Sequence, residues 1–314
     1  MRLFEHQDFD QAVLAAAKHF GLQESLVEKD YFVTEALRII AQFAGDKVIF
    51  KGGTSLSKGW NLIDRFSEDI DIFLDPVGYQ PELTKRGIDR ELKKMRDAVE
   101  GHPGLAYVKA ESQTIGGFGR IDRFSYGQRF PGISSRVLVE AGTASGREPT
   151  ETKTLSSLVG QFMKETGGSV GAEDEAGFEL RLLHFRRTFV EKMFTIHGKI
   201  ELFKAKGQPL GSYARHYYDL HCLGQRDEVV KMLQSDEYAT IKTDYDGISR
   251  KYFAKSYFFP KDMQFSASDA LFPAGELRDM IAKEYEAQCR VLCYRPHPTW
   301  DEVEETFRRL KPNL

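Results

Sequence analysis

The chain of 314 residues is long enough for two modest domains or one large domain. Its content of 41% hydrophobic and 29% charged residues is typical of a folded globular protein and excludes a disordered or fibrous one. Its apolar stretches are far shorter than the roughly 20 residues of a membrane helix, and its acidic start is unlike a signal peptide. Only three cysteines imply no disulfide framework, so the sequence predicts a cytoplasmic protein, and a net charge of −3 gives no global sign of a nucleic-acid partner.

We expect two helices near the N-terminus, at residues 8–20 and 24–43, because apolar residues recur there with the helical period. A short strand is expected at residues 47–50, just before a glycine pair. Residues 54–60 are expected to begin a short helix, because their hydroxyl groups suit a helix N-terminus. Residues 69–74, DIDIFL, alternate acidic and apolar side chains as a half-buried strand does.

The rest of the pattern divides the chain into two predicted domains. A charged helix at residues 81–100 precedes three strand candidates, AYVKAES, IDRFSYGQRF and SSRVLVEAG, and then a polar, irregular region at residues 143–154. The glycine-rich segment 167–177 is the most linker-like. We therefore expect an α/β domain over residues 1–170 and a mainly helical domain over residues 171–314. Helices of the second domain are expected at residues 186–204, 212–224, 227–256, 275–294 and 299–310.

Two aspartates in DIDIFL are the clearest chemical signal. Side chains two apart in a strand point the same way, so Asp69 and Asp71 project together and Ile70 and Ile72 face the other side. Two neighbouring carboxylates repel each other unless cations lie between them. Magnesium, or the similar manganese, prefers such oxygen ligands and keeps positions open for substrate phosphates. The pair therefore predicts a divalent metal site.

The segment upstream of the aspartates, residues 52–58, has features suited to binding a nucleoside triphosphate. Gly52 and Gly53 let the backbone approach a ligand closely, and Thr54, Ser55 and Lys58 add hydroxyl donors and a positive charge. The segment lacks the Walker A pattern and the glycine spacing of a dinucleotide-binding fingerprint. A triphosphate held beside two metal-binding aspartates is typical of metal-assisted nucleotidyl transfer.

These motifs resemble a known family. A glycine pair followed by DIDI is similar to the signature of the DNA polymerase β-type nucleotidyltransferase superfamily. Within it, FKGGTSLSKGW and RFSEDIDIFL resemble the AbiEii/AbiGii group of bacterial toxins, which includes abortive-infection toxins and mycobacterial transferases that modify tRNA. VEKDYFVTEAL, VEKMFTIHGK and ARHYYDLHCL resemble further motifs of the group. The resemblance implies an α+β fold, with a mixed sheet and flanking helices followed by a mainly helical domain.

The superfamily implies a third metal-binding carboxylate on a later strand, flanked by apolar residues. In RVLVEAG, Glu140 stands between Val139 and Ala141. By resemblance, we assign the role of third metal-binding carboxylate to Glu140. Asp122 is the rival candidate, although Arg123 directly after it weakens the alternation.

By the same resemblance, Lys192 would contact the nucleotide phosphates. Asp219 would lie in the active site, as a proton acceptor or as an organiser of basic neighbours. Many members of the group have serine directly after the first glycine, where this chain has Gly53. Thr54 and Ser55 are both candidates for the role of that serine.

The resemblance implies a toxin that transfers a nucleotide to the 3′ end of tRNA and is paired with an antitoxin. A basic stretch suits such an acceptor, because tRNA binding depends on neutralising phosphates. Between Arg181 and Tyr217, eight lysines and arginines stand against two glutamates. The candidate nucleic-acid-binding residues in this stretch are Arg186, Arg187, Lys199 and Arg215.

Three other functions remain open from the sequence. A nucleotidyltransferase for a small molecule, such as an antibiotic, would share the first motif but would favour an acidic second domain. A non-catalytic nucleotide-binding protein could retain the fold, although the three carboxylates argue against it. Phosphorylation of a partner protein could use the same site.

Overall fold

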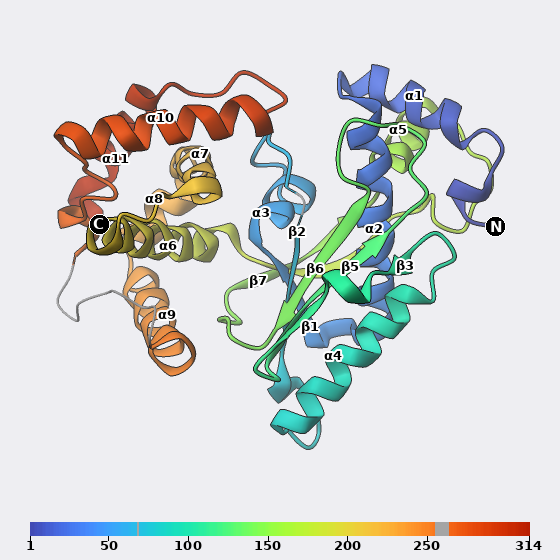
Figure 1. Ribbon diagram of the computed structural model, residues 1–314, viewed down its shortest axis with the longest axis horizontal. Coiled ribbons are helices and arrows are strands. Elements are labelled where there is room, and N and C mark those ends of the chain that lie inside the picture. The colour runs from blue at the N-terminus through green and yellow to red at the C-terminus, as the bar shows by residue number, and fades with distance from the viewer. Residues whose placement is uncertain (68, 255–263) are drawn as a thin grey trace. The chain divides into compact units, whose positions relative to one another are not determined.

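The computed structural model describes residues 1–67, 69–254 and 264–314 (Figure 1). It divides into two compact units. The sheet unit comprises Met1–Gly59, Glu68–Thr143 and Thr150–Leu183, and the helical unit comprises Trp60–Ser67, Ala144–Pro149 and His184–Leu314.

The sheet unit contains an eight-stranded mixed sheet in the order β3-β5-β6-β2-β1-β8-β7, with β4 paired to β5. The pairs β2–β6 and β1–β8 are parallel, and the other pairs are antiparallel. This arrangement confirms the predicted mixed sheet. The strands are β1 (Val48–Lys51), β2 (Asp69–Leu74), β3 (Ala106–Tyr107), β4 (Gln113–Ile115), β5 (Gly119–Ser125), β6 (Arg136–Gly142), β7 (Thr150–Leu155) and β8 (Phe178–Leu183).

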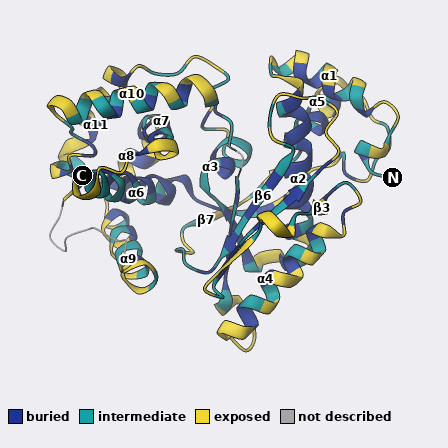
Figure 2. Ribbon diagram, in the orientation of Figure 1, coloured by how far each residue is buried: buried dark blue, intermediate teal, exposed yellow. Residues whose placement is uncertain are grey.

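Helices pack against this sheet and leave alternate strand residues less buried. The helix α2 packs on β1, β6 and β8, and α4 packs on β5. Figure 2 shows α2 as largely buried along its length. In β6 every second residue is buried, namely Val137, Val139 and Ala141, while Glu140 lies on the other face. The helices of this unit are α1 (Phe9–Phe20), α2 (Glu24–Ala44), the short α3 (Gly52–Thr54), α4 (Lys85–Glu100) and α5 (Leu158–Thr166).

The helical unit is built around α7, which packs against α6, α10 and α11. The segment 60–67 belongs to it, because the Phe66 N–H donates to the carbonyl of Leu292 at 2.8 Å and the Tyr294 N–H donates to that of Asp64 at 3.2 Å. Its helices are α6 (Phe185–Lys206), α7 (Arg215–Gly224), α8 (Asp227–Leu233), α9 (Asp236–Phe253), α10 (Gly275–Leu292) and α11 (Trp300–Leu310).

Three features differ from the sequence-based expectations. The region 143–154, expected to be irregular, contains all but the last residue of strand β7. The sheet continues past the glycine-rich segment 167–177 into β8, so residues 171–183 belong to the sheet unit. The helix expected at residues 227–256 is two helices, α8 and α9, and its last two residues lie outside the described part.

Within the described residues, no helix is both long enough and apolar enough to cross a membrane.

Candidate active site

The two aspartates and the predicted third carboxylate lie on one face of the sheet. Asp71 on β2 is the register partner of Glu140 on β6 and of Lys51 on β1. Asp69 precedes Asp71 by two residues on β2, so its side chain points to the same face. The structure therefore brings Asp69, Asp71 and Glu140 together, with Lys51 beside them.

Asp122, the rival for the third carboxylate, faces the other side of the sheet. Its register partner is the buried Val139, which is the neighbour of Glu140 in the chain. The Asp122 carboxylate accepts hydrogen bonds from the Arg120 guanidinium at 2.9 and 2.7 Å. Asp122 is thus a buried partner of Arg120, and Glu140 is the third carboxylate of the face that carries Asp71.

Gly52 lies directly against Asp71. Its φ is +77°, and a Cβ atom at this position would lie 1.8 Å from Oδ2 of Asp71. A glycine is therefore required here both by the backbone and by the neighbouring carboxylate. The Thr54 hydroxyl donates a hydrogen bond to the backbone carbonyl of Asp69. Residues 52–54 thus contact β2 at both aspartates.

The three carboxylates repel one another in the absence of a cation. Burial, followed by the negative charges of Asp71 and Asp69, raises the pKa of Glu140 to about 7, against the opposing effect of Lys51. An all-oxygen donor set under such repulsion fits magnesium or manganese. In the described ranges, no three His, Cys, Asp or Glu side chains form a complete metal-ligand group. Magnesium bound by one or two carboxylates commonly takes substrate phosphates and water as its other ligands.

Cation binding is expected to strengthen as the pH rises through about 7, because the Glu140 carboxyl must lose its proton first. A raised carboxyl pKa stabilises the metal-free fold below the ordinary pKa, and this stabilisation is lost as pH rises toward 7. Magnesium should therefore raise the melting temperature more at about pH 8 than at about pH 6. Thermal unfolding with and without magnesium measures the difference.

Glu140→Gln is the matched control for this pH dependence. The substitution removes the titrating carboxyl and keeps its shape, so the magnesium effect should become nearly independent of pH. An equal magnesium effect at both pH values in the unmodified protein would contradict the prediction.

The hydroxyl groups and the lysine that follow Gly53 make contacts within the sheet unit. Ser55 is fully buried, and its Oγ donates to the carbonyl of Gly52 at 2.9 Å. The Lys58 Nζ lies 2.7 Å from Oδ1 of Asp30 and donates to the carbonyl of Ser156 at 3.0 Å. The Lys58 ammonium is therefore already paired and is not among the proposed phosphate ligands. Gly53 stays partly exposed.

A second group of charges lies inside the helical unit, around Asp219 on α7. Asp219 is fully buried, and its carboxylate accepts hydrogen bonds from Nε and Nη2 of Arg65 at 2.6 and 2.8 Å. The Lys192 Nζ lies 2.7 Å from Oδ2 of Asp219 and 3.0 Å from Nδ1 of His216. Lys192 and Asp219, predicted from separate motifs, thus form one buried ion pair.

This buried cluster has more positive than negative groups. Burial alone would raise the pKa of Asp219, but Arg65 and Lys192 hold it well below its usual value. Burial lowers the pKa of Lys192. Burial and the Lys192 charge lower the pKa of His216 to about 3, so the imidazole is neutral at pH 7. With Lys192 protonated, one positive charge is left over within Arg65, Lys192 and Asp219.

Arg65 and Lys51 were not among the predicted site residues. Arg65 lies 154 positions before Asp219, so no motif spacing relates them. Both residues nevertheless adjoin motifs that were recognised. Lys51 directly precedes the glycine pair, and Arg65 lies four residues before Asp69. One basic residue therefore adjoins the glycine pair and another adjoins the aspartate motif. These neighbouring positive charges are the sequence signal that could have identified both residues.

Two of the four residues predicted to bind nucleic acid are paired with acidic neighbours. Arg187 is only 2% exposed, and its guanidinium lies 2.8 Å from Glu191 and 2.6 Å from Asp244. Arg186 lies 3.1 Å from Glu237. Arg187 therefore holds elements of the helical unit together, and it does not form part of an open basic surface.

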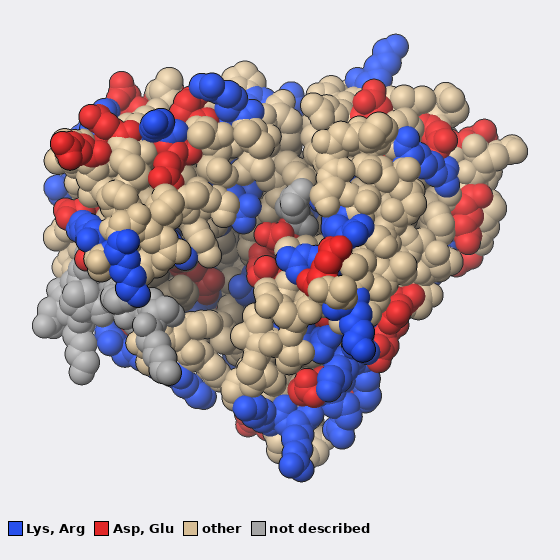
Figure 3. Space-filling view, in the orientation of Figure 1, with Lys and Arg blue, Asp and Glu red and all other residues tan. Residues whose placement is uncertain are grey.

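The other two predicted residues lie partly at the surface. The Lys199 ammonium is 3.8 Å from the centre of the Tyr213 ring, and Arg215 begins α7. In the sheet unit, exposed lysines and arginines gather over α4 (Figure 3). Ion pairs within the helix offset part of this charge, including Lys93 with Asp89 at 2.7 Å.

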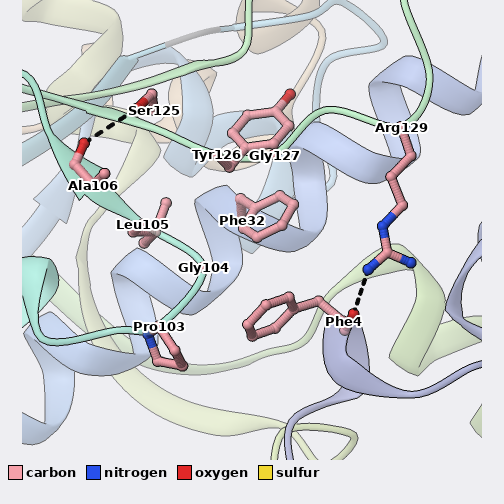
Figure 4. Close-up of a pocket in the computed structure, with 10 residues that line it drawn as sticks. All are labelled: Phe4, Phe32, Pro103, Gly104, Leu105, Ala106, Ser125, Tyr126, Gly127 and Arg129. Atoms are coloured by element: carbon pink, nitrogen blue, oxygen red, sulfur yellow. Dashed lines mark hydrogen bonds between the residues drawn. The ribbon is translucent and has the colours of Figure 1, made fainter.

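A cavity of about 570 Å³ lies elsewhere on the sheet unit (Figure 4). The rings of Phe4 and Phe32 and the backbone of Gly104 line it, and the Arg129 guanidinium at its edge donates to the carbonyl of Phe4 at 2.6 Å. None of the predicted site residues lines this cavity.

The mixed sheet with its flanking helices has the fold of a nucleotidyltransferase toxin of known structure. MenT4, a nucleotidyltransferase toxin from Mycobacterium tuberculosis H37Rv, has a similar fold, with a TM-score of 0.57 and 18% sequence identity over 95% of this chain and 89% of that chain. JHP933 from Helicobacter pylori matches more weakly, with a TM-score of 0.36 and 14% identity over 82% of this chain and 91% of that one. Comparison with curated proteins finds no match.

The chain belongs to the AbiEii family. The family model described as nucleotidyl transferase AbiEii toxin, Type IV TA system, matches residues 36–306, which is most of the sequence. The protein is therefore a nucleotidyltransferase toxin of a toxin–antitoxin family, as the sequence motifs suggested.

Proposed function

We propose that the protein transfers a nucleoside monophosphate from a nucleoside triphosphate to the 3′-terminal hydroxyl of a tRNA, and that this transfer inhibits translation. The observation that carries the proposal is the row of carboxylates beside Gly52. Asp71 is in register with Glu140, lies on the same face as Asp69, and leaves no room for a side chain at position 52. The family adds the toxin role.

In the proposed reaction, the backbone of Gly52 and Gly53 approaches the triphosphate. Asp69 and Asp71 would hold a divalent cation together with phosphate oxygens of the triphosphate. The cation would supply positive charge that neutralises the α-phosphate and the leaving pyrophosphate. The acceptor oxygen forms a bond to the α-phosphorus while the bond from that phosphorus to the β-phosphate oxygen breaks. Glu140, once ionised, takes the proton from the acceptor hydroxyl, and it lies on the same face of the sheet as Asp71.

In the proposed function, the helical unit supplies positive charge for binding phosphates. Arg65 and Lys192 outnumber Asp219 within the buried cluster, so their net charge favours phosphate nearby. We propose that this charge attracts the phosphates of the substrates, the role that the resemblance gave to Lys192. Lys199 and Arg215 are the proposed tRNA contacts among the predicted basic residues. An antitoxin encoded with the toxin would control the activity, and release of the toxin during phage infection would arrest the cell.

Incubation of the purified protein with each labelled triphosphate and a tRNA pool tests the proposal. The expected result is label on tRNA that depends on magnesium or manganese, with sequencing showing added nucleotides at the 3′ end. Label on small molecules instead of tRNA would support antibiotic modification. Label on protein would support phosphorylation. Absence of transfer with every triphosphate and acceptor would contradict enzymatic function.

Gly52→Ala is expected to lower nucleotidyl transfer by about a hundredfold or more, because the new Cβ would displace the Asp71 carboxylate. Initial rates of transfer measure the effect. Gly21→Ala is a matched control, since Gly21 also has a positive φ of +65° but has no atom within 4 Å of the place that a Cβ would take. Both variants should lose about 1 kcal/mol of stability from backbone strain. Equal transfer by the two variants would contradict the assigned contact.

A further inference from the structure

Lys51 extends the row of carboxylates by one position. It is the last residue of β1, and its register partner is Asp71, which in turn partners Glu140 on β6. Register partners on neighbouring strands carry their side chains on the same face. The order across the three strands is therefore Glu140, Asp71 and Lys51.

The Lys51 ammonium is available for a ligand. Across the described ranges, no hydrogen bond or ion pair engages it, and the side chain is partly exposed. Lys58, seven residues later, is the contrasting case, because Asp30 and the carbonyl of Ser156 occupy its ammonium. A lysine that stands beside carboxylates without a direct ion pair is suited to an anionic ligand that arrives with its own cation.

The position of Lys51 in the row indicates which part of the substrate it meets. In an in-line displacement the attacking and leaving oxygens lie on opposite sides of the phosphorus. Glu140, the proposed proton acceptor, marks the side of the attacking hydroxyl. Lys51 lies across Asp71 from Glu140, and the close-approach residue Gly52 follows it directly. The side of Lys51 is therefore the side of the leaving group.

We propose that Lys51 binds the β- and γ-phosphate oxygens of the nucleoside triphosphate and neutralises the pyrophosphate as it leaves. The inference rests on the proposed nucleotidyl transfer. It adds a residue that contacts the substrate and assigns the β1 side of the row to the leaving group. A nucleoside monophosphate has no β- or γ-phosphate, so its binding does not involve Lys51.

Calorimetric titration of the full chain with magnesium and an α,β-methylene nucleoside triphosphate tests this inference. Lys51→Ala should weaken triphosphate binding by about tenfold to a hundredfold, the usual effect of losing a charge-assisted hydrogen bond. Binding of the nucleoside monophosphate should stay unchanged, and Lys51→Arg should recover part of the triphosphate affinity. Lys47→Ala is the control for the loss of one lysine outside the row. Its ammonium lies over the Tyr79 ring, 4.9 Å from the ring centre, so this variant should bind the triphosphate normally.

Two outcomes would overturn the inference. In one, Lys51→Ala binds the triphosphate as tightly as the unmodified protein does. In the other, it loses affinity for triphosphate and monophosphate equally, which indicates a structural role. Because this titration needs no acceptor, a selective loss of triphosphate binding would support Lys51 even if transfer to tRNA failed. Full transfer activity in Lys51→Ala would reject Lys51 and leave the proposed function intact.

Discussion

Replacing Asp71 with alanine is expected to reduce nucleotidyl transfer by about a thousandfold or more, and the fold should remain intact. Asp71 is the middle residue of the row, in register with both Glu140 and Lys51, and its carboxylate fills the space beside Gly52. Its loss would remove a cation ligand and the negative charge nearest to the glycine segment. Initial rates with saturating magnesium and triphosphate measure the effect.

The stability of a second variant, Asp71→Asn, separates a functional role of this residue from a structural one. Asp71 raises the pKa of Glu140 by repulsion, so Asp71→Asn should leave the melting temperature of the metal-free protein equal or higher. Asp122→Asn is the control on the opposite face of the sheet. It should lower stability, because it weakens the buried pair with Arg120, and should largely retain transfer. Substantial transfer by Asp71→Ala would contradict the proposed mechanism.

The site in the sheet unit could be predicted because its information is local in sequence. Alternation in DIDIFL fixes the common face of Asp69 and Asp71, and the adjoining glycine pair permits close approach. Strand β7 escaped prediction for the opposite reason. Its residues, TETKTL, are mostly polar, and only Leu155 is fully buried. Pairing along its whole length with β8, a distant segment, makes it a strand.

The roles of the cations depend on tertiary partners that the sequence does not reveal. Lys58 resembles a phosphate ligand in its motif, yet Asp30 from α2 binds its ammonium. The concentration of basic residues after Arg181 resembles a nucleic-acid surface, yet Arg187 is buried against acidic groups of its own unit. Composition records the charges but not the partners that neutralise them. Lys51, which lacks such a partner among the described residues, was overlooked for the same reason.

Replacing Asp219 with alanine is expected to lower the free energy of unfolding by about 3–5 kcal/mol, the usual cost of leaving buried charges without their partner. Arg65 and Lys192 share this carboxylate, and all three side chains are buried. Without Asp219, two positive groups would face each other away from water. Urea unfolding of the variant and the unmodified protein measures the loss.

Lys192→Met tests whether the excess positive charge serves function and not only stability. It leaves the two hydrogen bonds between Arg65 and Asp219 in place, so the loss of stability should be well below that of Asp219→Ala. Transfer should nevertheless fall, because the cluster no longer carries a net positive charge to attract phosphate. If Lys192→Met transferred nucleotides at the unmodified rate, the cluster would be a structural ion pair. If Asp219→Ala unfolded like the unmodified protein, the buried charges would need another source of compensation.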